Sequence, residues 1–365
     1  MSFFKKIFSS KQKTISSNEE FWSWFKTQQR IFFNAVKTGT NIEKDFFDQL
    51  SQKLDGLKPG YFFLTGMLSN DMAELIITAD GTIKNIVFAE ELVASAPSLP
   101  GWKFTALKEE MNIEQTTIKM GEYEYNSKNM YFYPNDHNNY PDEIDITIIH
   151  QDANEQNNHT ITIGVQIFLD NYLGELHSAT IIDHLKVIRK DQARKELIPI
   201  EKLKSFLIWR EKEFIEKYEG TRSHTDNDTY SILEAKLTNG NPLIAVINTE
   251  LLTWDRKASH PWILNFILQY GAEDTIGLPD RQTYKLIDEI EDDLINELKS
   301  FEGYLNIGRE TAGGTREIYF ACKEFRNSSK IAYKIQQKYI NQIKISYEIF
   351  KDKYWQCFNH YIINP

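Results

Sequence analysis

The stretch Gly303-Tyr-Leu-Asn-Ile-Gly-Arg-Glu-Thr-Ala-Gly-Gly-Thr-Arg-Glu-Ile-Tyr-Phe320 predicts two paired β-strands. Apolar and polar residues alternate on both sides of Gly313-Gly314, and this pattern around a glycine pair is typical of a hairpin. Matching the apolar positions gives three opposite pairs: Leu305 with Phe320, Ile307 with Ile318, and Arg309 with Arg316. Two arginines directly opposite each other repel unless an acidic group lies nearby. We therefore expect an anion or a carboxylate at Arg309 and Arg316.

The segments around this hairpin indicate the fold of the C-terminal half. A strand is expected at 261–270 and a helix at 280–298, followed by the hairpin. A helix starting near Ser328 or Ser329 and a strand at 343–349 come after it. This order of strand, helix, two strands, helix and strand is that of a ferredoxin-like βαββαβ antiparallel sheet with its helices on one face.

The N-terminal half also mixes helices and strands. Helices are expected between 18 and 56, and strands at 61–65, 74–78 and 83–88, with Asp80-Gly81 as a tight turn before the last strand. The polar stretch from 219 to 228 is the best candidate linker. The sequence thus predicts an α+β protein with two domains, preceded by a basic extension: 1–17 flexible extension, 18–220 N-terminal α+β domain, and 229–365 C-terminal ferredoxin-like domain.

The first 13 residues have two possible interpretations. Phe3, Phe4, Ile7 and Phe8 would share one helical face among several lysines, which suits a weak membrane-surface anchor. A frayed terminal extension is the simpler interpretation, because chain termini are commonly disordered. The segment lacks the apolar run and cleavage site of a signal peptide.

Composition excludes several classes of protein. The formal net charge of -10 argues against a nucleic-acid binder, since phosphate binding requires clustered Lys and Arg. The acidic balance suits a protein partner with a basic surface. Only Cys322 and Cys357 occur, so no disulfide framework is indicated and a cytoplasmic location is expected. No apolar run approaches the roughly 20 residues that cross a bilayer.

Motifs for catalysis are not found. No zinc-binding histidine spacing, nucleophile elbow, phosphate-binding loop or dinucleotide fingerprint is present, so we predict no catalytic residue, metal or cofactor. Asp288, Glu289, Glu291, Asp292 and Asp293 form an acidic run within the helix at 280–298. Carboxylates so closely spaced fan out around a helix, which makes a solvated face or a docking surface for a basic partner more plausible than a metal site.

Four residues are the candidates for binding a small anionic ligand: Arg309, Arg316, His260 and Tyr319. His260 lies beside Asp255 and Arg256 at the start of a strand. The simpler interpretation gives the two arginines to carboxylates within the protein and makes His260 a structural residue of a turn.

Several short segments resemble a known family. They are His260-Pro-Trp262, Gly277-Leu-Pro279, Gly303-Tyr-Leu-Asn-Ile-Gly-Arg-Glu-Thr311, Arg316-Glu-Ile-Tyr-Phe320 and Trp355. Together they resemble the bacterial family called Domain of Unknown Function 695 over about residues 225 to 360. Phe62-Phe-Leu-Thr-Gly-Met67 and Leu169-Asp-Asn-Tyr-Leu-Gly-Glu175 are similar to the region that precedes this domain in longer members. The resemblance implies a fold and a bacterial origin, but no reaction.

Three hypotheses on function remain open. The first is a non-enzymatic protein-binding or regulatory module. The second is a sensor or enzyme for a small anionic ligand held by Arg309 and Arg316. The third is an immunity-type inhibitor of a basic nuclease.

Overall fold

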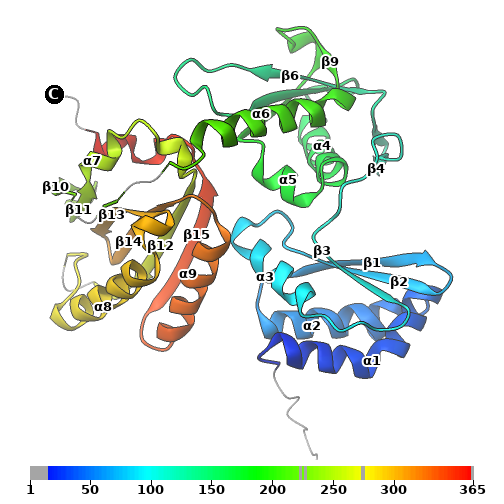
Figure 1. The fold of residues 1–365 in the computed structure, drawn as a ribbon, viewed down its shortest axis with the longest axis horizontal. Coiled ribbons are helices and arrows are strands. Elements are labelled where there is room, and N and C mark those ends of the chain that lie inside the picture. Colours follow the sequence, from blue (N-terminus) through cyan, green and yellow to red (C-terminus); the bar gives the residue numbers. More distant parts are fainter. Residues whose placement is uncertain (1–14, 222–223, 226–227, 273–275, 363–365) are drawn as a thin grey trace, which may run out of the picture. The chain divides into compact units, whose positions relative to one another are not determined.

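A computed structural model describes residues 15–221, 224–225, 228–272 and 276–362. Most of the expected N-terminal extension, and part of the expected linker at 219–228, lie outside these residues. The described chain has a mixed α/β fold with several β-sheets (Figure 1). It divides into two compact units: unit 1 is Met1–Asp80 with Phe88–Lys108, and unit 2 is Gly81–Val87 with Glu109–Pro365.

Unit 1 is built on a three-stranded sheet in the order β1-β2-β3. Its elements are α1 (Asn18–Thr38), a π-helix (Glu43–Phe47), α2 (Asp48–Leu57), β1 (Phe62–Ser69), β2 (Met72–Thr78) and β3 (Trp102–Ala106). The pair β1 and β2 is antiparallel, whereas β2 and β3 are parallel. A core of buried aromatic side chains, including Phe21, Phe25 and Phe32 of α1, stabilises this unit.

The prediction of a strand at 83–88 is wrong, because these residues begin the helix α3 (Ile83–Ala94). Ile86, Ala89 and Leu92 are fully buried at a spacing of three residues, which is the period of a helix and not of a strand. Asp80 and Gly81 do form a turn with positive φ, but it leads into this helix. A short apolar run is compatible with either element until packing decides between them.

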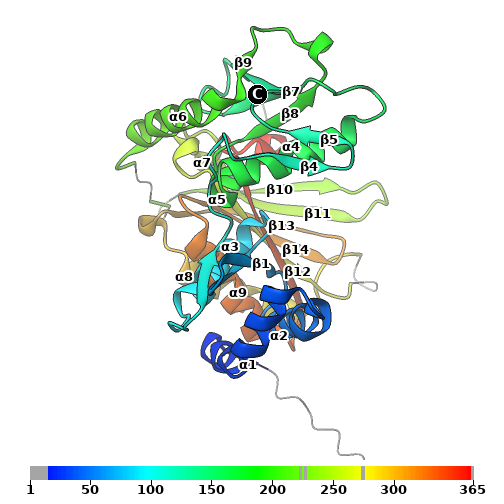
Figure 2. The same ribbon diagram turned by 90° about the vertical axis from the view of Figure 1, so that its right-hand side faces the viewer.

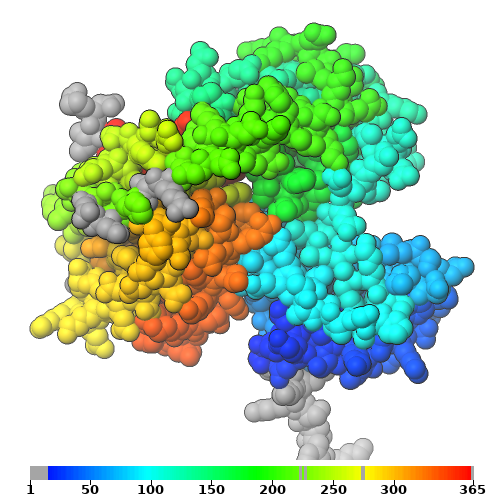
Figure 3. Space-filling model, in the orientation of Figure 1, coloured from blue at the N-terminus to red at the C-terminus, as the bar shows by residue number. Residues whose placement is uncertain are grey.

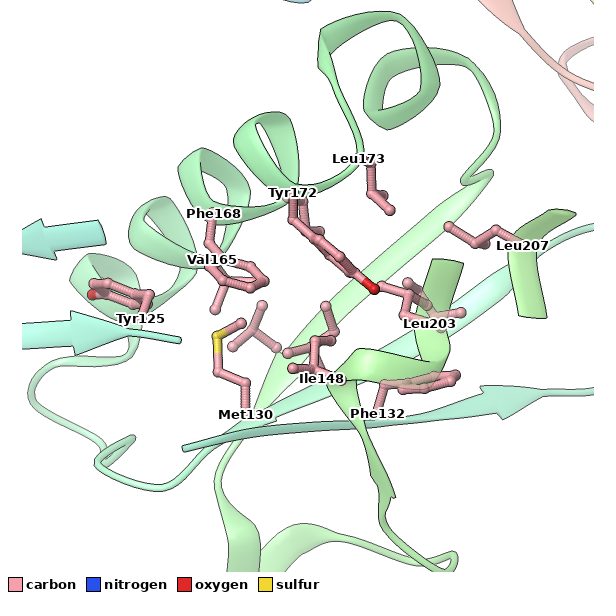
Figure 4. Packing of buried hydrophobic residues seen from close by; sticks show 14 of the residues in the cluster. Tyr125, Met130, Phe132, Ile148, Val165, Phe168, Tyr172, Leu173, Leu203 and Leu207 are labelled. Carbon is pink, nitrogen blue, oxygen red and sulfur yellow. The ribbon is translucent and has the colours of Figure 1, made fainter. Parts of the chain in front are cut away.

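The first part of unit 2 carries a four-stranded sheet in the order β8-β7-β6-β9. Its elements are β6 (Met130–Asn135), β7 (Asp145–His150), α4 (Asn158–Tyr172), α5 (Glu175–Thr180), β8 (His184–Ile188), β9 (Ile198–Pro199), α6 (Leu203–Tyr218) and the separate hairpin of β4 (Ile118–Met120) and β5 (Tyr123–Tyr125). The strands β7 and β8 are parallel neighbours (Figure 2), and α4 and α5 lie between them in the chain. Side chains of α4, including Val165 and Phe168, pack on Met130 and Ile148 of one sheet face (Figure 4).

The second part of unit 2 is a six-stranded antiparallel sheet in the order β10-β11-β13-β14-β12-β15. Its elements are β10 (Tyr230–Lys236), β11 (Pro242–Asn248), α7 (Thr249–Leu252), β12 (Trp262–Gln269), α8 (Arg281–Glu297), β13 (Tyr304–Ala312), β14 (Thr315–Cys322), α9 (Arg326–Tyr339), β15 (Lys344–Lys351) and a 3-10 helix (Gln356–Tyr361). The helices α8 and α9 lie side by side (Figure 1). Leu251, Trp355 and Phe358 belong to a separate apolar cluster with Ile263 and Leu305 of the sheet.

The hairpin of β13 and β14 is present, but its expected register is wrong. The two-residue turn Gly313-Gly314 pairs Ala312 with Thr315, which places Thr311 opposite Arg316 and Arg309 opposite Ile318. A bulge between Asn306 and Gly308 then shifts the register by one residue. Turn length sets hairpin register, so the apolar pairing that we assumed did not predict it. Arg309 and Arg316 are therefore diagonal neighbours on one face.

Candidate functional site

The two arginines have carboxylate partners on α8. Arg309 Nη1 donates to Glu291 Oε1 at 2.6 Å, and Arg316 Nη1 lies 3.1 Å from Asp288 Oδ1 and 3.4 Å from Glu291 Oε2. Arg316 Nε also donates to Thr311 Oγ1 at 3.0 Å. The Arg316 side chain is 4% exposed and that of Arg309 is 28% exposed. The carboxylate expected near the arginines is thus supplied by α8.

His260 and Tyr319 lie away from this pair. Tyr319 alternates with Arg316 and Ile318 along β14, so it belongs to the opposite face, where its hydroxyl donates to Glu317 Oε2 at 3.0 Å. His260 is buried beside Trp254, and its Nδ1 lies 2.8 Å from Ser259 Oγ. Burial, and then the charge of Lys323, lower the pKa of His260 to about 4. The structure therefore brings Arg309 and Arg316 together, but not with the other two candidates.

The acidic run of α8 is largely paired within the protein. Besides Asp288 and Glu291, Asp293 accepts from Lys338 Nζ at 2.6 Å and from the Tyr339 hydroxyl at 2.7 Å. These contacts leave fewer uncompensated charges on this helix than the sequence suggests.

A cavity of about 1240 Å³ in unit 2 lies on the sheet of β6, β7 and β8. We call it the β8 groove, because every residue of β8 lines it. The other lining residues come from the ends of β6 and β7, from 154–158 and from 189–195: Tyr133, Asn135, Asp136, His137, Asp145, Thr147, Asn154, Glu155, Asn158, Arg189, Asp191, Gln192, Ala193, Arg194 and Lys195.

The floor of the groove is the sheet face that α4 does not cover. Strand register sets three rows of side chains across it: Asn135, Asp145 and His184; then Tyr133, Thr147 and Lys186; then Tyr131, Ile149 and Ile188. The third row is apolar and packs with Ala193 and Leu197, which cover that end of the face. Tyr133 of the second row belongs to the same apolar cluster, whereas Thr147, Lys186 and the first row are polar and line the groove.

Segment 189–195 connects β8, at one edge of the sheet, to β9, at the other edge. It is held by charges along its length. Arg189 Nη1 donates to Glu155 Oε1 at 2.7 Å, and Lys195 Nζ donates to Pro134 O at 2.6 Å and lies 3.4 Å from Asp136 Oδ2. These contacts tie both ends of the segment to the walls of the groove.

Two histidines that line the groove, His137 and His184, are each paired with a carboxylate. His137 Nε2 lies 2.6 Å from Asp145 Oδ2, and Asn135 Nδ2 donates to Asp145 Oδ1 at 2.9 Å. His184 Nε2 lies 3.2 Å from Glu143 Oε2, and burial raises the pKa of this glutamate. Among the described residues, no group of three or more His, Cys, Asp or Glu has an arrangement that could hold a metal ion.

The outer edge of β8 also faces the groove. The backbone N–H of His184 donates to Ile144 O of the neighbouring segment at 3.2 Å. Because backbone groups alternate in direction along a parallel strand, the N–H and C=O groups of Leu185 and Val187 point away from β7. Both side chains pack into the core on the α4 side. These two residues therefore present backbone groups to the groove.

Sequence reasoning missed this site. The available signals were the alternation of polar residues at 145 and 147, the histidines at 137 and 184, and the charged stretch 189–195. None forms a known motif. The residues converge only through the pairing of β6, β7 and β8, which is not visible in a single sequence.

Residues 235–363 match the model of a family described as "Family of unknown function (DUF695)". This match confirms the resemblance of the C-terminal part of the chain. No curated protein and no solved structure matches the chain. Within the part of the chain that the structure describes, none of the helices is long and apolar enough to cross a membrane.

Proposed function

We propose that the protein is a non-enzymatic binding module that holds a segment of a partner protein in the β8 groove. The observation that carries this proposal is the groove itself, a cavity of about 1240 Å³ that follows an edge strand. Small-molecule sites commonly have volumes of about 300–1,000 Å³. A longer occupant fits the dimensions of this groove better than a small metabolite.

The contacts of the arginine pair support this choice over an anion sensor. An anion that bound Arg316 would have to displace Glu291, whose side chain is 6% exposed. Removing one partner of a buried ion pair costs about 3–5 kcal/mol, because the remaining charge loses its compensation. The β8 groove requires no such rearrangement.

The proposal also covers the fold of the C-terminal segment and the cellular location of the protein. We assign the segment from β12 to β15 a ferredoxin-like fold, supported by the strand order β13-β14-β12-β15 and by the two intervening helices. We further propose that 18–220 and 229–365 act as two domains and that the protein is cytoplasmic. The charge of the partner is considered in the next subsection.

A selection from a display library of random peptides tests the proposed function. Full-length protein carrying a photoreactive residue at position 186, within the groove, is expected to cross-link to the selected peptides. The same residue at position 212, on exposed α6, serves as the matched control (Figure 3). A selection that enriches no peptide, or equal cross-linking from both positions, would contradict the proposal.

A further inference from the structure

We infer that the β8 groove recognises an extended acidic peptide, which adds to the free edge of β8 as a further strand. The inference rests on the proposed function and specifies the kind of partner. It is carried by three independent observations: the unpaired edge of β8, the segment that covers the sheet face beside it, and two cationic side chains of the groove that have no ion-pair partner among the described residues.

The edge of β8 has free hydrogen-bonding groups. In the four-stranded sheet β8 is outermost and pairs only with β7. Among the described residues, the outward N–H and C=O groups of Leu185 and Val187 have no backbone partner. An extended peptide satisfies such groups by strand addition, which is a recurring mode of peptide recognition. Their side chains are fixed in the α4 core, so the edge is a rigid template.

The geometry of the floor suits a peptide with alternating side chains. On β8, His184, Lys186 and Ile188 point to the open face, and the intervening residues point to the core. Successive side chains of a strand added beside β8 would alternate in the same way. Those on the open face would then lie between the polar rows of the sheet and segment 189–195.

The charges of the groove favour an acidic peptide. The carboxylates that line it have partners: Glu155 and Asp191 lie against Arg189, Asp136 lies near Lys195, and Asp145 contacts His137. By contrast, Lys186 and Arg194 line the groove without an ion-pair partner among the residues that the structure describes. The lining as a whole holds four Asp or Glu and four Lys or Arg, but the two charged side chains that lack such a partner are both cationic and are free to meet a ligand's carboxylates. Charge complementarity of this kind selects between partners.

This inference differs from the expectation of a partner with a basic surface. That expectation rested on the net charge and on the acidic run of α8, whose carboxylates are largely paired to arginines and a lysine of the same unit. The unpaired charged side chains of a groove act on its ligand more directly than the net charge of the chain, because screening limits electrostatic interactions to about 8–10 Å at physiological salt.

Two pools of synthetic eight-residue peptides with strand-forming sequences test the inference on the full-length protein. One pool has Asp or Glu at alternate positions and the other has Lys or Arg. Fluorescence anisotropy is expected to show at least tenfold tighter binding of the acidic pool, and weaker binding as salt is raised. Lys186→Glu should weaken acidic-pool binding at least tenfold, whereas Lys202→Glu, outside the groove, should change it less than twofold. Circular dichroism checks that both variants fold.

Amide hydrogen exchange distinguishes strand addition from other binding. Bound acidic peptide is expected to protect the amides of Leu185 and Val187. Binding without this protection, or a basic pool that binds as tightly as the acidic one, would overturn the inference while leaving a peptide-binding groove. If light scattering shows a dimer without peptide, and both amides are protected in that dimer, the occupant of the edge is a second copy of the chain. This result would also overturn the inference. If neither pool binds and the display selection enriches no peptide, the proposed function is contradicted as well.

Discussion

Glu291 compensates two arginines at once, and its removal should therefore be costly. Its side chain is 6% exposed and contacts both Arg309 and Arg316. Glu291→Leu is expected to lower the free energy of unfolding by about 3 kcal/mol, because it leaves a buried guanidinium under-compensated. Asp288→Asn is the matched control, since Asp288 is 43% exposed and should cost less than about 1 kcal/mol. Urea unfolding of both variants measures the difference; equal losses would mean that Glu291 does not hold the pair.

His260 makes the stability of the C-terminal sheet depend on pH. Burial, followed by the charge of Lys323, lowers its pKa to about 4, against an ordinary value near 6.5. Between pH 6.5 and pH 4, His260 binds a proton in the unfolded chain but stays neutral in the folded chain. The free energy of unfolding therefore falls as the pH drops from 6.5 towards 4. Between pH 7 and pH 5 this residue should account for a loss of about 2 kcal/mol.

The variant His260→Asn removes this titration while keeping a polar atom near Ser259. Urea unfolding at pH 7 and pH 5 is expected to show a smaller pH-dependent loss for the variant than for the wild type. The comparison is between the two pH values for each protein, so a general loss of packing in the variant cancels. An equal loss of unfolding free energy between pH 7 and pH 5 in both proteins would show that the pKa of His260 is not lowered in the folded state.

At the scale of elements, the β13–β14 hairpin depends on one glycine. Gly308 has φ of 135°, and a Cβ there would lie 2.1 Å from Val246 O of the neighbouring strand β11. Gly308→Ala is expected to destabilise the protein by more than about 3 kcal/mol, since the clash is with backbone that cannot rotate away. Gly66→Ala in β1 is the control, because nothing lies within 4 Å of its Cβ position. Melting temperatures compare the two, and similar values would argue against the bulged register.

The same hairpin shows which structural features the local sequence pattern predicts. Alternation and the glycine pair correctly predicted two strands, but turn length and the bulge at Asn306 and Gly308 decided their register. Similarly, the apolar residues at 83–88 were assigned to a strand, although their burial follows a helix. The local pattern predicts that a helix or strand is present. The register of paired strands, and whether a short apolar run forms a helix or a strand, depend on tertiary neighbours.

At the scale of the molecule, Asp183 joins parts of unit 2 that lie far apart in the sequence. It accepts from Lys353 Nζ at 2.7 Å and lies 2.8 Å from Lys351 Nζ, with its own side chain 7% exposed. Although burial alone would raise the pKa of Asp183, the two ammonium groups hold it below its usual range. Its contribution is therefore present above the ordinary aspartate pKa and is lost at lower pH.

Asp183→Asn is expected to lower the free energy of unfolding by about 3 kcal/mol at pH 7, because it leaves two largely buried lysines without this partner. Glu216→Gln provides the control, since Glu216 is 64% exposed in a pair with Lys212 and should cost less than about 0.5 kcal/mol. Urea unfolding at pH 7 and pH 3 measures both. A loss for Asp183→Asn that stays undiminished at pH 3 would contradict the electrostatic origin of the effect.

The sequence by itself determined the α/β character of this protein, the hairpin at 303–320 and the resemblance to a family of unknown function. These follow from periodicity, turn residues and short motifs, which act between neighbours along the chain. The tertiary structure alone placed Glu291 between Arg309 and Arg316, and separated both from His260 and Tyr319. It alone assembled the β8 groove, because the rows of polar side chains on its floor come from strands whose pairing and register depend on contacts distant in sequence.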